Sequence, residues 1–268
     1  VFHMSVAGVA LATVISQALA ALLVCITLVK EPDATHLDLH QLRIDRAMAM
    51  EIIRIGVPAG LQGMAFSLSN VVVQSSINSF GSSVNVAGNS ASNNIENFVY
   101  IGMSAFTQAC ITFTSQNVGA QNLKRVKSIF NHSMVLTTLS AMLMGFLVWF
   151  FGESLLAFYT SDPAVVEAGM LRLFWVSMFL FLNGILDVFV SSLRGMGYSS
   201  LPTIVMLVGI CGVRLLWLLL IFPMHRTLTT IYLCFPLSWT ITSVVLGFIW
   251  LYCYRHMLRT NGQQAQNA

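Results

Sequence analysis

Seven apolar segments of membrane-spanning length divide this sequence. They cover residues 6–29, 55–80, 98–116, 134–151, 173–193, 201–222 and 228–254, with Asp187 and Arg214 as interruptions of the fifth and sixth. A helix needs about 20 apolar residues to cross the hydrocarbon core of a bilayer, whereas barrel strands are much shorter. We therefore expect an all-α integral membrane protein with about seven transmembrane helices.

The composition excludes several other classes of protein. Only 9% of the 268 residues are charged and 56% are hydrophobic, which leaves too little polar material to cover a soluble fold. The net charge of +3 is small and the basic residues lie between apolar segments, so we expect no nucleic-acid partner. The five cysteines fall singly inside apolar stretches, so we interpret them as packing residues and expect no metal site.

The basic residues also predict the topology. Ten of them fall on alternate connections between segments, and only Arg226 falls on the others. The ten are Lys30, Arg43, Arg46, Arg54, Lys124, Arg125, Lys127, Arg194, Arg255 and Arg259. The positive-inside rule places these connections and the C-terminus in the cytoplasm, which suits a plasma-membrane protein.

Changes in composition along the chain suggest four regions. Residues 1–29 form one helix, and 30–54 mix both charge signs as in a cytoplasmic linker whose second half, from Asp45, could be a surface helix. Residues 55–257 hold six segments, and the polar stretch 258–268 predicts a disordered cytoplasmic tail. The chain opens on Val1 without the basic start of a signal peptide, so we interpret it as a fragment.

Three phrases give the chain a family resemblance. RIGVPAGLQGMAFSLSN opens the second segment, QNVGAQNLKRVK follows the third, and SSLRGMGYSSLPTI joins the fifth and sixth. Each phrase has a plain structural interpretation: Pro58 in a first helical turn, Gly119 ending a helix in a left-handed conformation, and Gly195, Gly197 and Pro202 in a tight connection. In this order and spacing, over about residues 1–257, they resemble the multidrug and toxic compound extrusion (MATE) transporters. The resemblance implies one half of a two-lobe, twelve-helix transporter: the last helix of a truncated N-terminal lobe, the interlobe linker and the whole C-terminal lobe.

Two acids fall where a charge is costly, and each has two interpretations. Asp187 is either a site for a coupling ion or proton, because burial favours the neutral acid, or a structural acid tied to Arg214 or to the hydroxyl of Ser191 or Ser192. Glu96 follows a polar stretch in which a helix could begin anywhere from Val84 to Asn94. An early start places Glu96 near mid-bilayer, and a late start places it in the first turn, where it complements the helix dipole.

The resemblance adds detail to these sites. Many MATE transporters carry an acid in the helix that matches residues 55–80, but this segment has none. The family's usual acid in the helix before LRG falls on Asn183, and Asp187 lies one turn further on the same face. We thus expect ion or proton coupling at Asp187, Glu96 and Asn183. A cavity for organic cations would be lined by Gln62, Phe66, Gln74, Asn78, Tyr100 and Met103, although aromatic and Met residues in such helices are more often packing residues.

These observations favour a secondary antiporter that exports cationic or amphipathic drugs and toxic compounds in exchange for Na⁺ or H⁺. The sequence has no GxxxxGK[ST] phrase, so we expect no cofactor beyond the coupling ion; HExxH and GxSxG are absent too, so we expect no enzyme. The partners would be the bilayer, small organic cations and the missing N-terminal lobe, without which the fragment should be inactive. Two alternatives remain: a flippase for lipid-linked saccharides, which would want a more basic cavity than Arg214 provides, and a seven-helix receptor or sensor.

Overall fold

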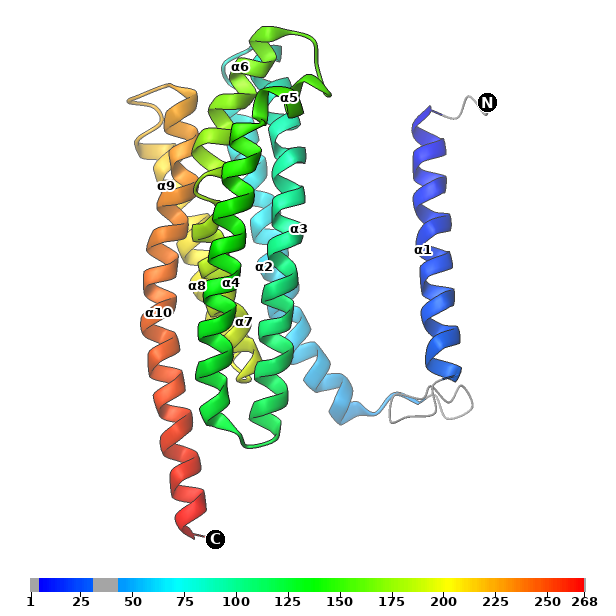
Figure 1. The fold of residues 1–268 in the computed structure, drawn as a ribbon, viewed down its shortest axis with the longest axis vertical. Coiled ribbons are helices and arrows are strands. Elements are labelled where there is room, and N and C mark those ends of the chain that lie inside the picture. Colours follow the sequence, from blue (N-terminus) through cyan, green and yellow to red (C-terminus); the bar gives the residue numbers. More distant parts are fainter. Residues whose placement is uncertain (1–4, 31–42, 268) are drawn as a thin grey trace. The chain divides into compact units, whose positions relative to one another are not determined.

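The computed structural model describes residues 5–30 and 43–267, and these residues form helices and turns without a strand (Figure 1). The chain divides into two compact units, residues 1–53 and 54–268. In the first unit, α1 (Ser5–Lys30) is apolar all round, and nearly all of its described side chains are exposed. A helix without a polar face has no side to turn to water, so α1 suits lipid or a helical partner.

The linker ends in helix α2 (Arg46–Asn78), which starts in the first unit and continues into the second. Asp45 caps it, because its Oδ1 accepts hydrogen bonds from the backbone N–H groups of Ala47 (2.7 Å) and Met48 (3.2 Å). Residues 31–42 of the expected linker lie outside the described residues. The early start corrects one prediction: Pro58 lies inside α2 rather than in its first turn.

The second unit continues with a series of helices, two of them π-helical. They are α3 (Ser83–Gly119), α4 (Leu123–Phe150), α5 (Gly152–Ala157), α6 (Pro163–Arg172), η2 (Leu173–Ser177), α7 (Leu180–Gly195), α8 (Ser200–Met206), η3 (Leu207–Gly212), α9 (Val213–Leu220) and α10 (Leu228–Asn267). α6, η2 and α7 follow one another as a single span, and so do α8, η3 and α9.

The core of the second unit lies among α3, α4 and α7, which pack against one another, with α6 against α3 and α10 against α7 (Figure 1). Small residues permit these close approaches. A Cβ on Gly88 of α3 would lie 2.8 Å from the backbone oxygen of Val165 and the backbone nitrogen of Gly169 in α6. A Cβ on Gly184 of α7 would lie 2.7 Å from the sulfur of Met103. Association through small residues is typical of helices in a membrane.

Within the described residues, six helices or helical runs are long and apolar enough to cross a membrane. They are Ala10–Lys30, Arg46–Asn78, Leu123–Phe150, Pro163–Gly195, Ser200–Leu220 and Leu228–Arg259. The seventh expected helix is α3, which has 37 residues and packs among the others, but its first half is rich in Asn and Ser. The expected all-α membrane fold is therefore confirmed.

The turns correct some details and support others. α3 ends at Gly119, but the left-handed residue of that turn is Gln121 (φ 59°) rather than Gly119. The connection between α7 and α8 is tight, as the glycine-rich phrase predicted: Gly197 adopts φ 92°, and α8 begins at Ser200. α10 continues to Asn267, through most of the polar stretch from 258 that we expected to be a disordered tail.

Candidate functional site

The largest group of predicted site residues meets in one cavity, which we call the Asp187 cavity. It has a volume of about 430 Å³ and lies between α2, α3 and α7. Its lining residues are Gln62, Gly63, Phe66, Asn97, Tyr100, Asn183, Asp187 and Arg194. Five of these were predicted from the sequence: Gln62, Phe66, Tyr100, Asn183 and Asp187.

Asp187 is half-buried in α7, and its neighbour on the same face is Asn183, one turn earlier. The Asn183 Nδ2 donates to Asp187 Oδ2 at 3.3 Å. Within the part of the chain that the structure describes, no hydrogen bond joins Asp187 to Arg214, Ser191 or Ser192. Arg214 donates from Nε to the Ser238 Oγ at 3.2 Å, and the Ser192 Oγ accepts from Trp250 Nε1 at 2.8 Å. Within the described residues, Asp187 has no cation within ion-pair distance.

Arg194, at the end of α7, lies at the wall of the same cavity. Its Nη2 donates to the Gln62 Oε1 of α2 at 2.6 Å. Two more hydrogen bonds join α2 to the rest of the second unit: Cys211 Sγ donates to the backbone oxygen of Ala65 (3.1 Å), and Asn89 Nδ2 donates to Gln74 Oε1 (2.7 Å). The cavity is thus lined by a carboxylate, carboxamides, two aromatic rings and one guanidinium, which can bind a cation through oxygen and ring faces.

Glu96 lies in a different place and, unlike Asp187, is paired with a cation. The α3 helix begins early, at Ser83, where the Ser82 Oγ accepts from the backbone N–H of Asn85 at 3.3 Å. Glu96 is therefore well inside the helix and buried, as the first of our two interpretations expected. Its carboxylate is paired with Arg172 of α6, a partner that the sequence analysis did not identify.

The Arg172 guanidinium is almost fully hydrogen-bonded. Nε and Nη2 donate to the two oxygens of Glu96 at 3.0 and 2.6 Å, Nη1 donates to Asn89 Oδ1 at 2.5 Å, and Nη2 also donates to Asn93 Oδ1 at 3.0 Å. These hydrogen bonds satisfy most of the N–H donors of the guanidinium. Burial of the same charge without partners would carry a large desolvation penalty. The cluster joins α3 to α6 next to the close approach at Gly88.

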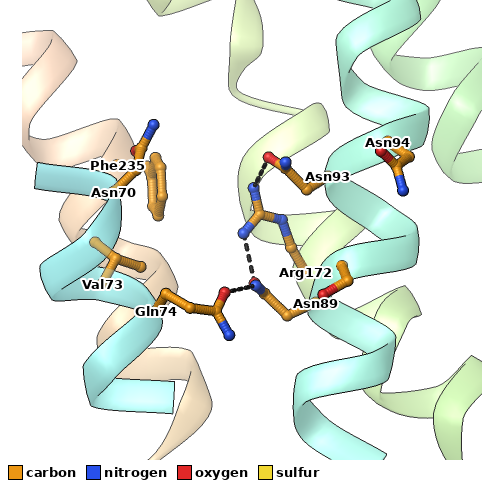
Figure 2. A pocket seen from close by; sticks show the side chains of 9 residues that line it. Asn70, Val73, Gln74, Asn89, Asn93, Asn94, Arg172 and Phe235 are labelled. Atoms are coloured by element: carbon orange, nitrogen blue, oxygen red, sulfur yellow. Dashed lines mark hydrogen bonds between the residues drawn. The ribbon is translucent and has the colours of Figure 1, made fainter. Parts of the chain in front are cut away.

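This cluster borders a second, smaller cavity of about 210 Å³, the Arg172 cavity (Figure 2). Figure 2 shows Arg172 between Asn89 and Asn93, with Gln74 of α2 facing Asn89. Hydroxyl and carboxamide groups dominate its lining, which consists of Asn70, Val73, Gln74, Asn89, Ser90, Asn93, Asn94, Arg172 and Phe235. The ring centre of Phe235 lies 5.5 Å from the Arg172 guanidinium carbon and 4.3 Å from that of Arg214.

Three of the predicted cavity residues therefore do not join Asp187. Gln74 lines the Arg172 cavity instead. Asn78 is exposed because it is the last residue of α2. Its Oδ1 accepts a hydrogen bond from Gln74 Nε2 at 3.0 Å. Met103 is 1% exposed and fills the space over Gly184, so it is a packing residue. Sequence reasoning missed Arg194 as a lining residue, although it lies only two turns after Asp187 on α7.

Long apolar helices that enclose polar cavities define a multi-pass membrane protein. Comparison with known proteins makes this specific: the MatE family model matches residues 58–219, more than half of the chain. The chain belongs to the multidrug and toxic compound extrusion (MATE) family.

Relatives and solved structures agree with this assignment. The chain is 28% identical over 183 residues to the probable multidrug resistance protein YpnP of Bacillus subtilis, covering 67% of this chain and 40% of the relative. It is 25% identical over 218 residues to the probable multidrug resistance protein NorM of Thermotoga maritima, covering 80% and 46%. A crystal structure of MATE in complex with MaL6 superposes with a TM-score of 0.84 at 16% identity, over 96% of this chain and 58% of that one, which shows a shared fold. The chain spans about half the length of the curated relatives that it matches.

Proposed function

We propose that this chain forms the C-terminal lobe of a secondary antiporter in the plasma membrane, with its C-terminus in the cytoplasm. The antiporter exports cationic or amphipathic organic compounds in exchange for Na⁺ or H⁺. The relatives named as multidrug resistance and export proteins support the substrate class. An N-terminal lobe completes the transporter, because the cavity of a two-lobe transporter lies at the interface of its repeats.

One observation carries the coupling site: Asp187 is an intramembrane acid in a polar cavity without an ion-pair partner among the described residues. An acid in that setting can bind a proton or, with the Asn183 carboxamide oxygen, a small cation. Glu96 lacks this freedom, since Arg172 already neutralises its charge. We therefore assign coupling to Asp187 and Asn183 and a structural role to Glu96.

The rings of Phe66 and Tyr100 supply a binding surface for the organic cation next to the carboxylate. Cations are attracted to aromatic faces, most strongly where water is excluded. A coupling ion and an organic cation that both require the ionised form of Asp187 would compete for it. Binding of one would then release the other, as exchange requires.

The test uses the complete transporter that contains this chain, reconstituted in proteoliposomes with a fluorescent organic cation. We expect an imposed Na⁺ or proton gradient to drive uptake or efflux of the cation, and Asp187→Asn to abolish gradient-driven flux while leaving expression intact. Glu153→Gln, which changes an exposed acid outside both cavities, is the matched control. Undiminished coupled flux in Asp187→Asn would return Asp187 to a structural role, and an absence of flux under either gradient in the unmodified protein would refute the antiporter.

A further inference from the structure

A third cavity lies on α10, away from the two polar ones. It has a volume of about 360 Å³ and is lined by α4, α7 and α10 through apolar residues. Phe130, Phe189, Gly247, Phe248, Trp250 and Leu251 form most of its surface. Phe248 is 70% exposed. We call this cavity the α10 groove.

Rigid aromatic walls and a missing side chain keep the groove open. The rings of Phe130 and Trp250 stack with centres 4.0 Å apart, and Phe189 lies 5.3 Å from Phe130. Trp250 is fixed by its hydrogen bond to Ser192. At Gly247 a Cβ would meet only Phe189, at an ordinary distance of 3.4 Å, so the floor of the groove could hold a larger residue but does not.

The groove continues along α10 into a basic hollow of about 500 Å³. Phe248 and Leu251 line both, and the hollow adds Tyr252, Arg255, His256 and Arg259. Their spacing of three and four residues places these side chains along one side of the helix. Among the residues that the structure describes, neither the groove nor the hollow is lined by an acid.

The order of these groups along α10 matches the layers of a bilayer. At 1.5 Å per residue, the ~30 Å hydrocarbon core takes about 20 residues from Leu228, which reaches the level of Gly247 and Phe248. The exposed Tyr252 then falls at the interface, where aromatic residues gather, and Arg255 and Arg259 fall at the headgroups. Figure 1 shows this end of α10 on the same side of the second unit as the start of α4, whose first turn carries Lys124 and Arg125.

We propose that the α10 groove and its basic hollow bind one anionic phospholipid. An acyl chain lies in the groove over Gly247, and the phosphate meets the guanidinium groups of Arg255 and Arg259. Charge complementarity selects the occupant: apolar chains fit the groove, whereas two cations without a lining acid favour an anionic headgroup. A zwitterionic phospholipid offers the same chains but a weaker match to two arginines.

The test is native mass spectrometry of the full chain purified in detergent, titrated with phosphatidylglycerol or with phosphatidylcholine of the same chains. We expect preferential binding of one phosphatidylglycerol. Arg255→Gln/Arg259→Gln should weaken it about 25-fold, equal to about 2 kcal/mol at about 1 kcal/mol for each basic residue near the phosphate. Gly247→Phe, which fills the floor of the groove, should weaken both lipids.

The matched control is Lys124→Gln/Arg125→Gln, which removes the same charge from the same end of the second unit but outside the hollow. Equal losses in the two double variants would overturn the site in favour of a general surface attraction. Equal binding of phosphatidylcholine would overturn the headgroup assignment. A dimer that lipid does not displace, and that Gly247→Phe disrupts, would show that a second copy of the chain fills the groove instead.

Discussion

Arg172 and Glu96 form a two-pronged ion pair between α6 and α3, with donor–acceptor distances of 3.0 and 2.6 Å. The two residues are 76 positions apart in the sequence, and both are buried. Asn89 and Asn93 accept the remaining bonds of the guanidinium. The pair therefore joins α6 to α3, and it supports our proposal that Glu96 has a structural role rather than one in ion exchange.

Breaking this pair on one side should be costly. Glu96→Met or Arg172→Met alone leaves one buried charge uncompensated, so each should lower the free energy of unfolding by about 3–5 kcal/mol. The double variant should cost less than either single change, because two apolar side chains replace two charges. Unfolding in mixed micelles, followed by tryptophan fluorescence, measures the three values; additive single effects would show that the residues are not coupled.

Exchanging the side chains of Asp187 and Asn183 tests whether a carboxylate anywhere on this face of α7 is sufficient for coupling, or whether it must be at position 187. Both lie in the Asp187 cavity, one turn apart. We expect Asp187→Asn to abolish ion-coupled transport by the complete transporter, and Asp187→Asn/Asn183→Asp to restore part of it. Flux assays in proteoliposomes give the comparison. Failure of the double variant to recover any coupling, with normal expression, would mean that the carboxylate must be at 187.

Arg194 should weaken cation binding in the Asp187 cavity, because its positive charge lines the same space. Arg194→Gln removes that charge and keeps a donor for Gln62, so we expect the affinity for the coupling ion to rise by about tenfold, a difference of about 1.4 kcal/mol. The ion dependence of transport measures it. Lys124→Gln loses the same charge outside the cavity and should leave the ion affinity unchanged; an equal rise there would point to a long-range effect of net charge.

Two glycines of α3 should respond in opposite ways to the same change. Gly88→Ala places a Cβ 2.8 Å from backbone atoms of α6, which cannot move aside cheaply, and should destabilise the protein by about 1–3 kcal/mol. Gly102→Ala meets nothing within 4 Å and should be neutral or stabilising by up to about 1 kcal/mol, because Ala favours a helix. Thermal unfolding in detergent distinguishes them, and equal melting temperatures would show that α3 and α6 are not held in close contact.

Much of the fold could be predicted from the sequence because lipid demands long apolar segments. The structure shows helices at all seven predicted positions, and Gly197 turns the chain where the glycine-rich phrase indicated. The α7 face was also predictable, since Asn183 and Asp187 are four residues apart. Gln62, Phe66 and Tyr100 join them in one cavity because α2 and α3 line it together with α7.

The remaining features depend on contacts between distant segments. Arg172 resembles a residue at the end of a span, and only the close approach of α6 to α3 at Gly88 brings it to Glu96. The span that we predicted from residue 173 also began too late, since α6 starts the same membrane span at Pro163. Met103 and Asn78 have side chains suited to a cavity, but the packing of Gly184 and the end of α2 decide their positions.

Among the described residues, three side-chain hydrogen bonds join α2 to its neighbours, through Gln62, Ala65 and Gln74, and none of them includes a carboxylate. Water can replace partners of this kind at about 0.5–1.5 kcal/mol for a neutral bond and somewhat more for the one to Arg194, far less than the separation of Arg172 from Glu96 would cost. In mechanical terms, the second unit has a stiff frame of α3, α4, α6 and α7 and a compliant edge at α2. A force applied to that edge would move α2 first and would change the shape of both polar cavities, because α2 is a wall of each.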